Sequence, residues 1–307
     1  MQNVDSDIII IGAGGCGLMA ALVAAKKGAQ VLLLEKTDKP GGGTAFSSKG
    51  IRAAGSRRQR ELKIGDDAAL YAQDILRRNN GESDAVLTRR LAETSGRVAD
   101  FLTDEAGIEF QIGEFVFGHG AQRSHSWKED KTVTDFLFAA VEREKKIQVR
   151  LSTPVLALEQ DDGGAVVRVK TGDGILTARK IILASGGFGA SAELLSKYIP
   201  KAVGIPFPGH HGSTGDGIKM GLEIGAAIEN MGAFQPYTRL TSVRESARWR
   251  RRWRYRAGSW SMPPEGVLSM RPDIPAASAL KCSIFPASTR TRFSMSGFLS
   301  CIETRRG

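Results

Sequence analysis

Three glycines near the amino terminus have the spacing of a turn that binds a diphosphate. They follow the pattern Gly12-x-Gly14-x-x-Gly17, directly after an apolar run over residues 7–11. In such a turn the first glycine permits the bend, the second lets a pyrophosphate approach the main chain, and the third lets a helix pack on the strand. The main-chain N–H groups at the helix end would bind the phosphates. These groups belong to Gly12, Ala13, Gly14, Gly15, Cys16 and Gly17.

The elements needed to position this turn occur in the right order. Residues 7–11 are typical of a parallel strand buried on both faces, residues 18–28 of an alanine-rich helix closed by Gly28, and residues 30–35 of a second strand. Glu35 ends that strand, where its carboxylate could accept hydrogen bonds from a ribose diol and would repel a 2′-phosphate. This β-α-β unit predicts dinucleotide binding and disfavours NADP. The alternative is a chance glycine-rich turn.

A second glycine-rich stretch begins at Pro40 and runs through Gly42, Gly43 and Thr44 toward Ser48 and Gly50. It offers more main-chain donors than NAD needs, and Thr44 and Ser48 add hydroxyl donors. Residues 41–55 contain too much glycine and serine to predict a regular element. A flexible surface loop is the other interpretation.

The remaining pattern alternates between helical and strand-like segments. Residues 66–106 are expected to be helical, with a break at 79–81 and a restart capped by Ser83 or Asp84, and a further helix is expected over 131–145. Strands are expected over residues 148–151, 155–160, 165–170, 174–178 and 180–184, three of them joined by hairpin turns.

Four segments in this order resemble the flavoprotein subunits of succinate dehydrogenase and fumarate reductase, in the wider group with soluble fumarate reductases and 3-ketosteroid dehydrogenases. They are the fingerprint with Glu35-Lys36, the loop over 42–50, residues 184–189 (ASGGFG) and residues 213–217 (STGDG). The resemblance covers roughly residues 5–235 and implies FAD as the cofactor. It adds to the FAD site Lys36, Gly42, Gly43, Thr44, Ser48, Gly50, Val155, Ala184, Ser185, Gly186 and Asp216.

The resemblance also implies how these segments meet the cofactor. Residues 184–187 would lie against it, the strand from Val155 would contact the adenine side through its main chain, and the segment with Asp216 would lead into a helix near the flavin. Asp216 could also simply cap that helix, and the two roles are compatible because a capping carboxylate sits at a positive helix end.

Three departures from the family limit what is carried over. Some relatives attach the flavin covalently through a histidine where this chain has Gly43, so the FAD is expected to be noncovalent. The stretch over residues 231–237 lacks the substrate histidine of many relatives. Nothing after Leu240 matches the family's proton-donating arginine, its substrate-binding histidine and arginine, or the glycine-rich segment over the flavin ring. The catalytic residues are therefore unknown, and no metal site is expected.

Arg123 and His125 are the candidate substrate-binding residues. Arginine could hold a substrate carboxylate and histidine could hydrogen-bond to it. The other interpretation is a polar loop anchored by Trp127, just before the helix over 131–145.

The charge of the chain is concentrated at its end. The formal net charge is +10, yet residues 1–239 hold 30 Lys and Arg against 29 Asp and Glu. No nucleic-acid binding is therefore expected of residues 1–239. Residues 248–256 read RWRRRWRYR. A change of reading frame near residue 240 is the favoured explanation, a divergent tail the second, and a nucleic-acid or anionic-membrane patch the third.

The expected fold is α/β, a Rossmann-like FAD-binding domain in two pieces, residues 1–60 and 145–239, around a mainly helical capping segment, residues 61–144, with a basic tail over 240–307. The resemblance implies hydride transfer between flavin N5 and a carbon–carbon bond next to a carboxylate or carbonyl, with a carboxylate or enone substrate and an unknown electron partner. Loss of the carboxyl-terminal part would impair turnover; an inactive FAD- or nucleotide-binding remnant is the alternative. The glycines interrupt the apolar run over 8–25, so no transmembrane segment is expected. Asp5 and Asp7 argue against a signal peptide, and with a free Cys16 the expected location is the reducing cytoplasm.

Overall fold

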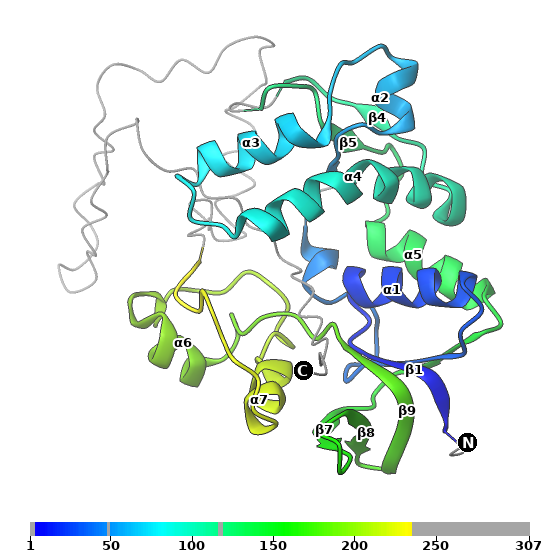
Figure 1. Cartoon of the computed structure of the whole chain (residues 1–307), viewed down its shortest axis with the longest axis vertical. Helices are drawn as coiled ribbons and strands as arrows, with labels where there is room; N and C mark the ends of the chain where they lie inside the picture. The colour runs from blue at the N-terminus through cyan, green and yellow to red at the C-terminus, as the bar shows by residue number, and fades with distance from the viewer. Residues whose placement is uncertain (1–3, 48–49, 116–118, 235–307) are drawn as a thin grey trace, which may run out of the picture. The chain divides into compact units, whose positions relative to one another are not determined.

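A computed structural model of the chain describes residues 4–47, 50–115 and 119–234, all within one compact unit. Its main sheet has six strands in the order β6-β2-β1-β9-β8-β7, and a second sheet has three strands in the order β3-β5-β4. Strands β1 (Ser6–Ile11) and β2 (Val31–Leu34) are parallel and are joined by helix α1 (Gly15–Lys26), as the sequence predicts. The α/β class is confirmed (Figure 1).

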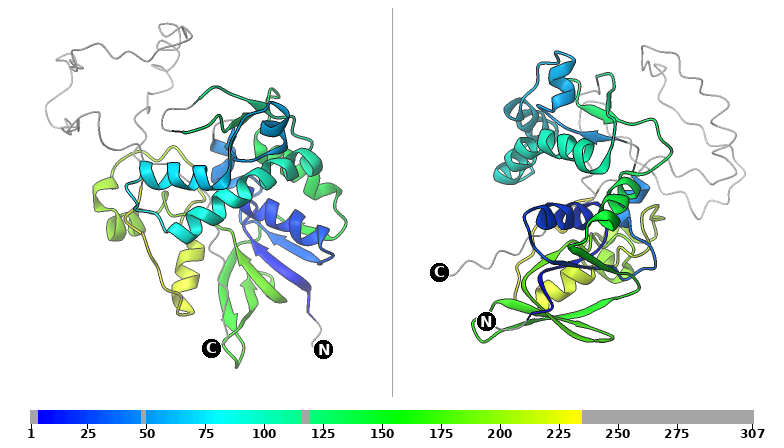
Figure 2. Two further views of the ribbon diagram at one scale, coloured as in Figure 1. Left: turned by 45° about the horizontal axis from the view of Figure 1, so that its top comes forward. Right: turned by 90° about the vertical axis from the view of Figure 1, so that its right-hand side faces the viewer.

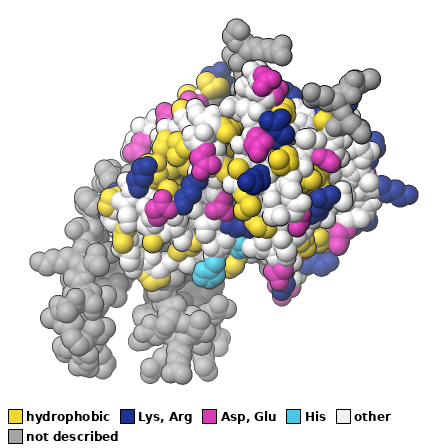
Figure 3. Space-filling view, turned by 90° about the horizontal axis from the view of Figure 1, so that it is seen from below, with side chains coloured by type: hydrophobic (Ala, Val, Ile, Leu, Met, Phe, Trp, Pro, Cys, Tyr) yellow, Lys and Arg dark blue, Asp and Glu magenta, His cyan; other side chains and the backbone are white. Residues whose placement is uncertain are grey.

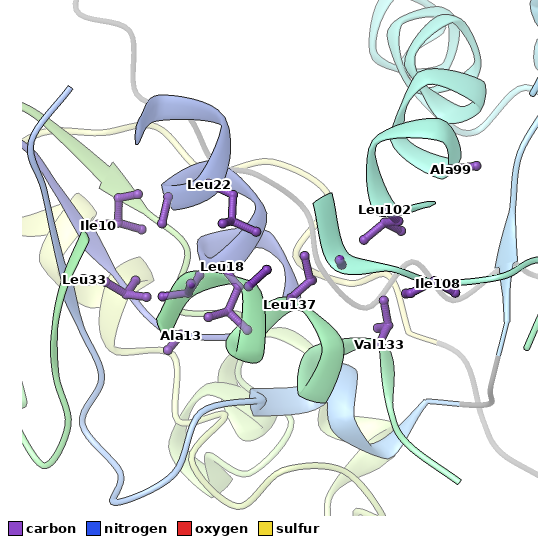
Figure 4. Close-up of a cluster of buried hydrophobic side chains, with 14 of the residues drawn as sticks. Ile10, Ala13, Leu18, Leu22, Leu33, Ala99, Leu102, Ile108, Val133 and Leu137 are labelled. Carbon is purple, nitrogen blue, oxygen red and sulfur yellow. The ribbon is translucent and has the colours of Figure 1, made fainter. Parts of the chain in front are cut away.

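Strand β1 is buried on both faces of the sheet because its alternate side chains enter two different cores. Ile10 packs with α1 and α5 (Val133–Arg143), whereas Ile9 and Ile11 pack with the hairpin strands and α7 (Asp216–Glu223). Figure 4 shows Leu18 and Leu22 of α1 directed toward Leu137 of α5. Apolar packing on both faces of the sheet therefore fixes the position of the carboxyl end of β1, where the glycine turn begins.

Strand β9 (Gly174–Leu183) corrects the sequence prediction, which divided it into strands over 174–178 and 180–184. Its first half pairs antiparallel with β8 (Val166–Thr171), and its second half pairs parallel with β1. Strand β7 (Val155–Gln160) completes the hairpins on the outside of β8 (Figure 2). One continuous strand thus carries the chain from the hairpins back to the centre of the parallel sheet.

The segment between β2 and β6 (Ile147–Arg150) is mainly helical. It begins with a 3-10 helix, η1 (Gly42–Phe46), and the short strand β3 (Ile51–Arg52), where the sequence predicted no regular element. The elements that follow are α2 (Arg57–Glu61), α3 (Ala68–Arg78), α4 (Ala85–Ala106), β4 (Gln111–Ile112), β5 (Ser124–Ser126) and α5.

Side-chain caps set the starts of these helices. Asp67 caps α3, Asp84 rather than Ser83 caps α4, and Thr132 caps α5. Helix α5 packs against α1, and β6 adds to the sheet beside β2. The expected boundary at residue 144 therefore separates α5 from the helix that it contacts; the domain boundaries themselves stay a prediction.

After β9 the chain forms α6 (Ala192–Tyr198), the 3-10 turn η2 (Pro200–Ala202) and α7. Gly215, in the left-handed conformation at φ 78°, is the N-cap residue of α7, and Asp216 is its first helical residue. The alternative interpretation of Asp216 as the N-cap is therefore off by one position. Its carboxylate nevertheless stands in the first turn, where the helix end is positive.

Candidate functional site: a main-chain cradle at the carboxyl edge of the sheet

Two of the three fingerprint glycines are required by contacts within the protein. Gly12 has a φ of 106°, and a Cβ there would lie 2.6 Å from the carbonyl oxygen of Ala184. A Cβ on Gly17 would lie 1.8 Å from the carbonyl oxygen of Gly12. The turn, the start of α1 and the end of β9 are therefore in direct main-chain contact, as the first and third glycines of the pattern predict.

Gly14 is different because the protein does not need a glycine there. It is the N-cap residue of α1 at φ −76°, and a Cβ would meet only the carbonyl oxygen of Gly41, at an ordinary 3.8 Å. No acidic residue occupies the first turn of α1, and the hydroxyl oxygen of Thr44 accepts a hydrogen bond from the N–H of Gly15, the first helical residue. The position leaves room beside a positive helix end for an anion, which is the chemistry expected of the second glycine.

Glu35 is buried and lies directly under the turn. Its Oε2 accepts a hydrogen bond of 2.8 Å from the main-chain N–H of Ala13, and its Oε1 accepts bonds from the N–H and hydroxyl of Thr37. A carboxylate has about four acceptor positions, so these three bonds leave capacity for a ribose hydroxyl. Glu35 thus joins the end of β2 to the glycine turn, a contact that the spacing alone did not reveal.

The second glycine loop is attached to the first. The N–H of Gly41 donates to the carbonyl of Ala13 at 2.8 Å, and the hydroxyl oxygen of Thr44 accepts from the N–H of Gly15 at 3.3 Å. Gly42 follows the bend at φ 50°, and a Cβ on Gly43 would meet nothing within 4 Å. The loop therefore extends the main-chain surface beside α1.

Two further residues predicted from this loop differ in what the structure shows. Gly50 is explained by packing, because a Cβ there would lie 3.1 Å from the carbonyl oxygen of His125. Ser48 lies outside the described residues.

The end of β9 closes the other side of the turn. The N–H of Ala184 donates to the carbonyl of Ile11 at 2.8 Å, and Gly186 continues in the left-handed region at φ 76° with open space around it. A Cβ on Gly217 would lie 2.1 Å from the Ser185 hydroxyl oxygen, so α7 begins directly against this strand end. Residues from 12–17, 35–36, 41–44, 184–186 and 215–217 therefore meet at one edge of the sheet.

Lys36 and Asp216, both predicted as cofactor residues, are paired with each other. Lys36 Nζ donates to Asp216 Oδ2 at 2.6 Å and to the Thr214 hydroxyl at 2.7 Å, and that hydroxyl donates to Asp216 Oδ1 at 2.7 Å. Burial alone would raise the pKa of the Asp216 carboxyl, but the bonds from Lys36 and Thr214 hold that pKa below its usual value. Asp216 is therefore an anion at neutral pH.

Val155 begins β7, as predicted, and the chain just before it runs beside the end of β2. The N–H of Thr153 donates to the carbonyl of Glu35 at 2.8 Å, and that of Ser152 to the carbonyl of Thr37 at 2.9 Å. The main chain leading to Val155 is thereby placed next to Glu35, the residue expected to hold the ribose. A contact of Val155 with adenine stays a prediction.

Arg123 is enclosed by carboxylates instead of facing a ligand. Its guanidinium makes two hydrogen bonds to Asp66, at 2.7 and 2.8 Å, and one to Asp74 at 2.5 Å, and its side chain is fully buried, over the Tyr71 ring. Burial would raise the pKa of Asp74, but Arg123 and the Gly120 N–H lower it. A fully buried guanidinium that binds two buried carboxylates favours the structural interpretation over substrate binding.

His125 is likewise bonded at both ring nitrogens. Nδ1 lies 2.9 Å from the Arg123 carbonyl oxygen and must donate to it, so Nε2 accepts, at 2.7 Å, from the Ser56 hydroxyl. Burial lowers the pKa of His125, which stabilises this neutral form. It lines a pocket of about 290 Å³ beside α2 and α4, but its polar atoms are engaged within the protein.

Main-chain donors and a positive helix end, together with Glu35 beside them, define a domain that binds an adenine dinucleotide. The model of the FAD binding domain family matches residues 7–260, which is most of the chain, so the chain belongs to that family. The match runs past Leu240, beyond the end expected from the motifs. FAD is the cofactor of this family, and the open position at Gly14 fits its diphosphate.

The chain is also similar to proteins that are named for their reductase activities. The chain is 31% identical to an NADH:fumarate oxidoreductase of Klebsiella pneumoniae, over 75% of this chain and 25% of that one, and 32% identical to a urocanate reductase of Eggerthella lenta, over 76% and 40%. An open flavocytochrome c3 fumarate reductase structure matches 72% of this chain and 41% of that one, with a TM-score of 0.68 and 28% identity.

The chain spans a quarter to about half of the length of the curated relatives that it matches. None of the helices in the described ranges is long and apolar enough to cross a membrane. The face in Figure 3 mixes cationic and anionic side chains. The basic tail lies outside the described residues, so its three explanations stay predictions.

Proposed function

We propose that residues 4–234 form the dinucleotide-binding part of an FAD-dependent oxidoreductase that acts on a carbon–carbon bond next to a carboxylate or carbonyl. The position of Gly14 carries the cofactor half of this proposal: the first turn of α1 holds no acidic residue, and a Cβ on Gly14 would meet only the carbonyl oxygen of Gly41, at 3.8 Å, so the protein's own packing does not require a glycine there. The named activities of the relatives, reduction of fumarate and of urocanate, support the substrate class.

Each part of the cradle would have a definite task toward FAD. The 12–17 turn would hold the diphosphate at the positive end of α1, while its Gly12 and Ala13 N–H groups stay bonded to Leu34 and Glu35. Glu35 would bind a ribose hydroxyl, and the segment before Val155 would border the adenine. Residues 184–186 and Asp216 would lie toward the flavin, which supplies hydride transfer when bound. Gly43 offers no atom for a covalent link, so we propose noncovalent FAD.

No catalytic acid can be assigned among the described residues. Arg123 and His125, the only substrate-binding residues expected from the sequence, have their polar atoms bonded inside the protein. We therefore propose that the 307-residue chain binds FAD but turns over little substrate by itself. The cytoplasmic location and the electron partner stay predictions.

A visible spectrum of the purified 307-residue chain, before and after denaturation, tests the cofactor half. A flavin absorbance that passes a small-pore filter after denaturation supports noncovalent FAD, and a chromophore retained with the polypeptide contradicts it. Measured reduction of fumarate or urocanate by this chain alone would contradict the proposal of little turnover.

A further inference from the structure

Lys36, Thr214 and Asp216 form a closed hydrogen-bonded triangle at the edge where FAD is proposed to bind. The three atom pairs lie 2.6, 2.7 and 2.7 Å apart, and the triangle joins the second residue after β2 to the first residue of α7. Lys36 and Asp216 are separated by 180 positions in the chain. The fold therefore places the ammonium group of Lys36 against the carboxylate of Asp216.

The carboxylate of Asp216 stands in an unfavourable place for binding an anion. Its helix begins against Ser185, and the strand end before Ser185 contacts the glycine turn through Ala184 and Gly12. Ligands of open α/β sheets bind in the crevice at the carboxyl ends of the strands, which is where these residues meet. An uncompensated negative charge there would repel a diphosphate through a partly desolvated medium.

The ion pair is not explained by stability. The side chains of Lys36 and Asp216 are 30% and 40% exposed, and ion pairs this accessible to water contribute little to folding. Lys36 instead cancels the charge of Asp216 at the edge where FAD is proposed to bind, which changes the electrostatic potential that an anionic ligand meets there.

We infer that Lys36 is a positioning residue that acts through Asp216: it neutralises and orients this carboxylate so that the edge accepts the anionic FAD, instead of binding the phosphates itself. This inference rests on the proposed function. It assigns Lys36 a role different from that of a direct cofactor ligand, with Asp216 Oδ2 engaged by Lys36.

A double-mutant cycle on the full 307-residue chain tests the inference, with FAD titrated by flavin fluorescence at low and high salt. Lys36→Met is expected to weaken FAD binding about tenfold at low salt and less at high salt, because salt screens the exposed carboxylate. Lys36→Arg is expected to keep the affinity, since it restores the charge. Lys36→Met in the Asp216→Asn background is expected to change affinity by less than about twofold, because no charge is left to neutralise.

A matched control removes the same charge elsewhere. Lys26 lies in the last turn of α1 and pairs with Glu105, far along the helix from the glycine turn. Lys26→Met is expected to leave FAD affinity unchanged, and the midpoint of urea unfolding without FAD is expected to be similar for both methionine variants. That second readout separates an electrostatic role from a structural one.

Three results would overturn the inference. An equal loss of affinity from Lys36→Met in both backgrounds would mean that Lys36 contacts FAD directly. Unchanged affinity in Lys36→Met, with wild type binding normally, would leave Lys36 no role while sparing the proposed function. Failure of the wild-type chain itself to bind FAD would overturn the proposed function and the inference together.

Discussion

The cradle at the sheet edge and the buried polar network around Arg123 contrast in how they use their polar groups. In the cradle, Gly14 begins a helix whose first turn holds no acidic residue, and a Cβ there would meet only the Gly41 carbonyl oxygen, at 3.8 Å. In the network, Arg123, Asp66 and Asp74 saturate one another, and both nitrogens of His125 are bonded. The polar side chains of Arg123 and His125 are thus bonded within the protein, whereas the cradle at the sheet edge is built mainly from main-chain atoms.

This contrast shows which signals in a sequence indicate a ligand. A glycine that the protein's own packing does not require, at an acid-free helix end, has no structural explanation and points to a ligand. An arginine and a histidine two positions apart indicate chemistry equally well from sequence, yet here they hold α2, α3 and β5 together.

The largest expected effect is on stability, from Arg123→Leu. It leaves the buried Asp66 without its ion-pair partner and Asp74 with only the exposed Arg77, so the free energy of unfolding is expected to fall by about 3–5 kcal/mol. Urea unfolding followed by circular dichroism measures this. The exposed pair of Arg57 and Asp104 offers the control, because Arg57→Ala is expected to produce no resolvable change. A stable Arg123→Leu protein with impaired substrate binding would restore Arg123 as a ligand.

Gly17→Ala is expected to have the next largest effect. Its methyl group would lie 1.8 Å from the Gly12 carbonyl oxygen, so α1 must move from β1 at a cost of about 3 kcal/mol, as in overpacked cores. Thermal unfolding without FAD measures the loss. An unchanged midpoint would mean that the turn and helix are not packed as described.

A smaller effect is expected in the pH dependence of stability. The folded pKa of His125 is lowered by burial, whereas the unfolded chain binds a proton below about pH 6.5. Stability is therefore expected to fall as the pH drops below about 6.5 toward the folded pKa.

His125→Gln is expected to reduce that slope in urea titrations between pH 8 and 5. His119, whose pKa burial also lowers, needs the parallel variant His119→Gln, so that the two contributions are separated. An identical slope in the wild type and His125→Gln would show that His125 does not titrate as described.

The first half of the fold could be predicted because its signals are local. The apolar run of β1, the glycine turn and the alanine-rich helix follow one another directly, and the hairpins carry their own turns. The continuity of β9 was missed because its two halves pair with different partners, β8 and β1, and no local pattern marks the change.

The contacts of the site residues were less predictable because they are long-range. Asp66 and Asp74 lie 57 and 49 positions from Arg123, and Asp216 lies 180 positions from Lys36. Thr37, which holds Glu35, has no motif to mark it. Sequence spacing identified the segments at the sheet edge, while the pairing of their side chains required the fold.

The most direct test of the cradle is an FAD titration of Gly14→Ala against Gly65→Ala. A Cβ at Gly14 meets only the Gly41 oxygen at 3.8 Å, and one at Gly65 meets nothing within 4 Å, so both variants should fold. The Gly14 methyl group would enter the diphosphate space, and FAD affinity is expected to fall at least about tenfold, or about 1.4 kcal/mol, while Gly65→Ala binds as the wild type does. Wild-type affinity in a folded Gly14→Ala protein would contradict the diphosphate site.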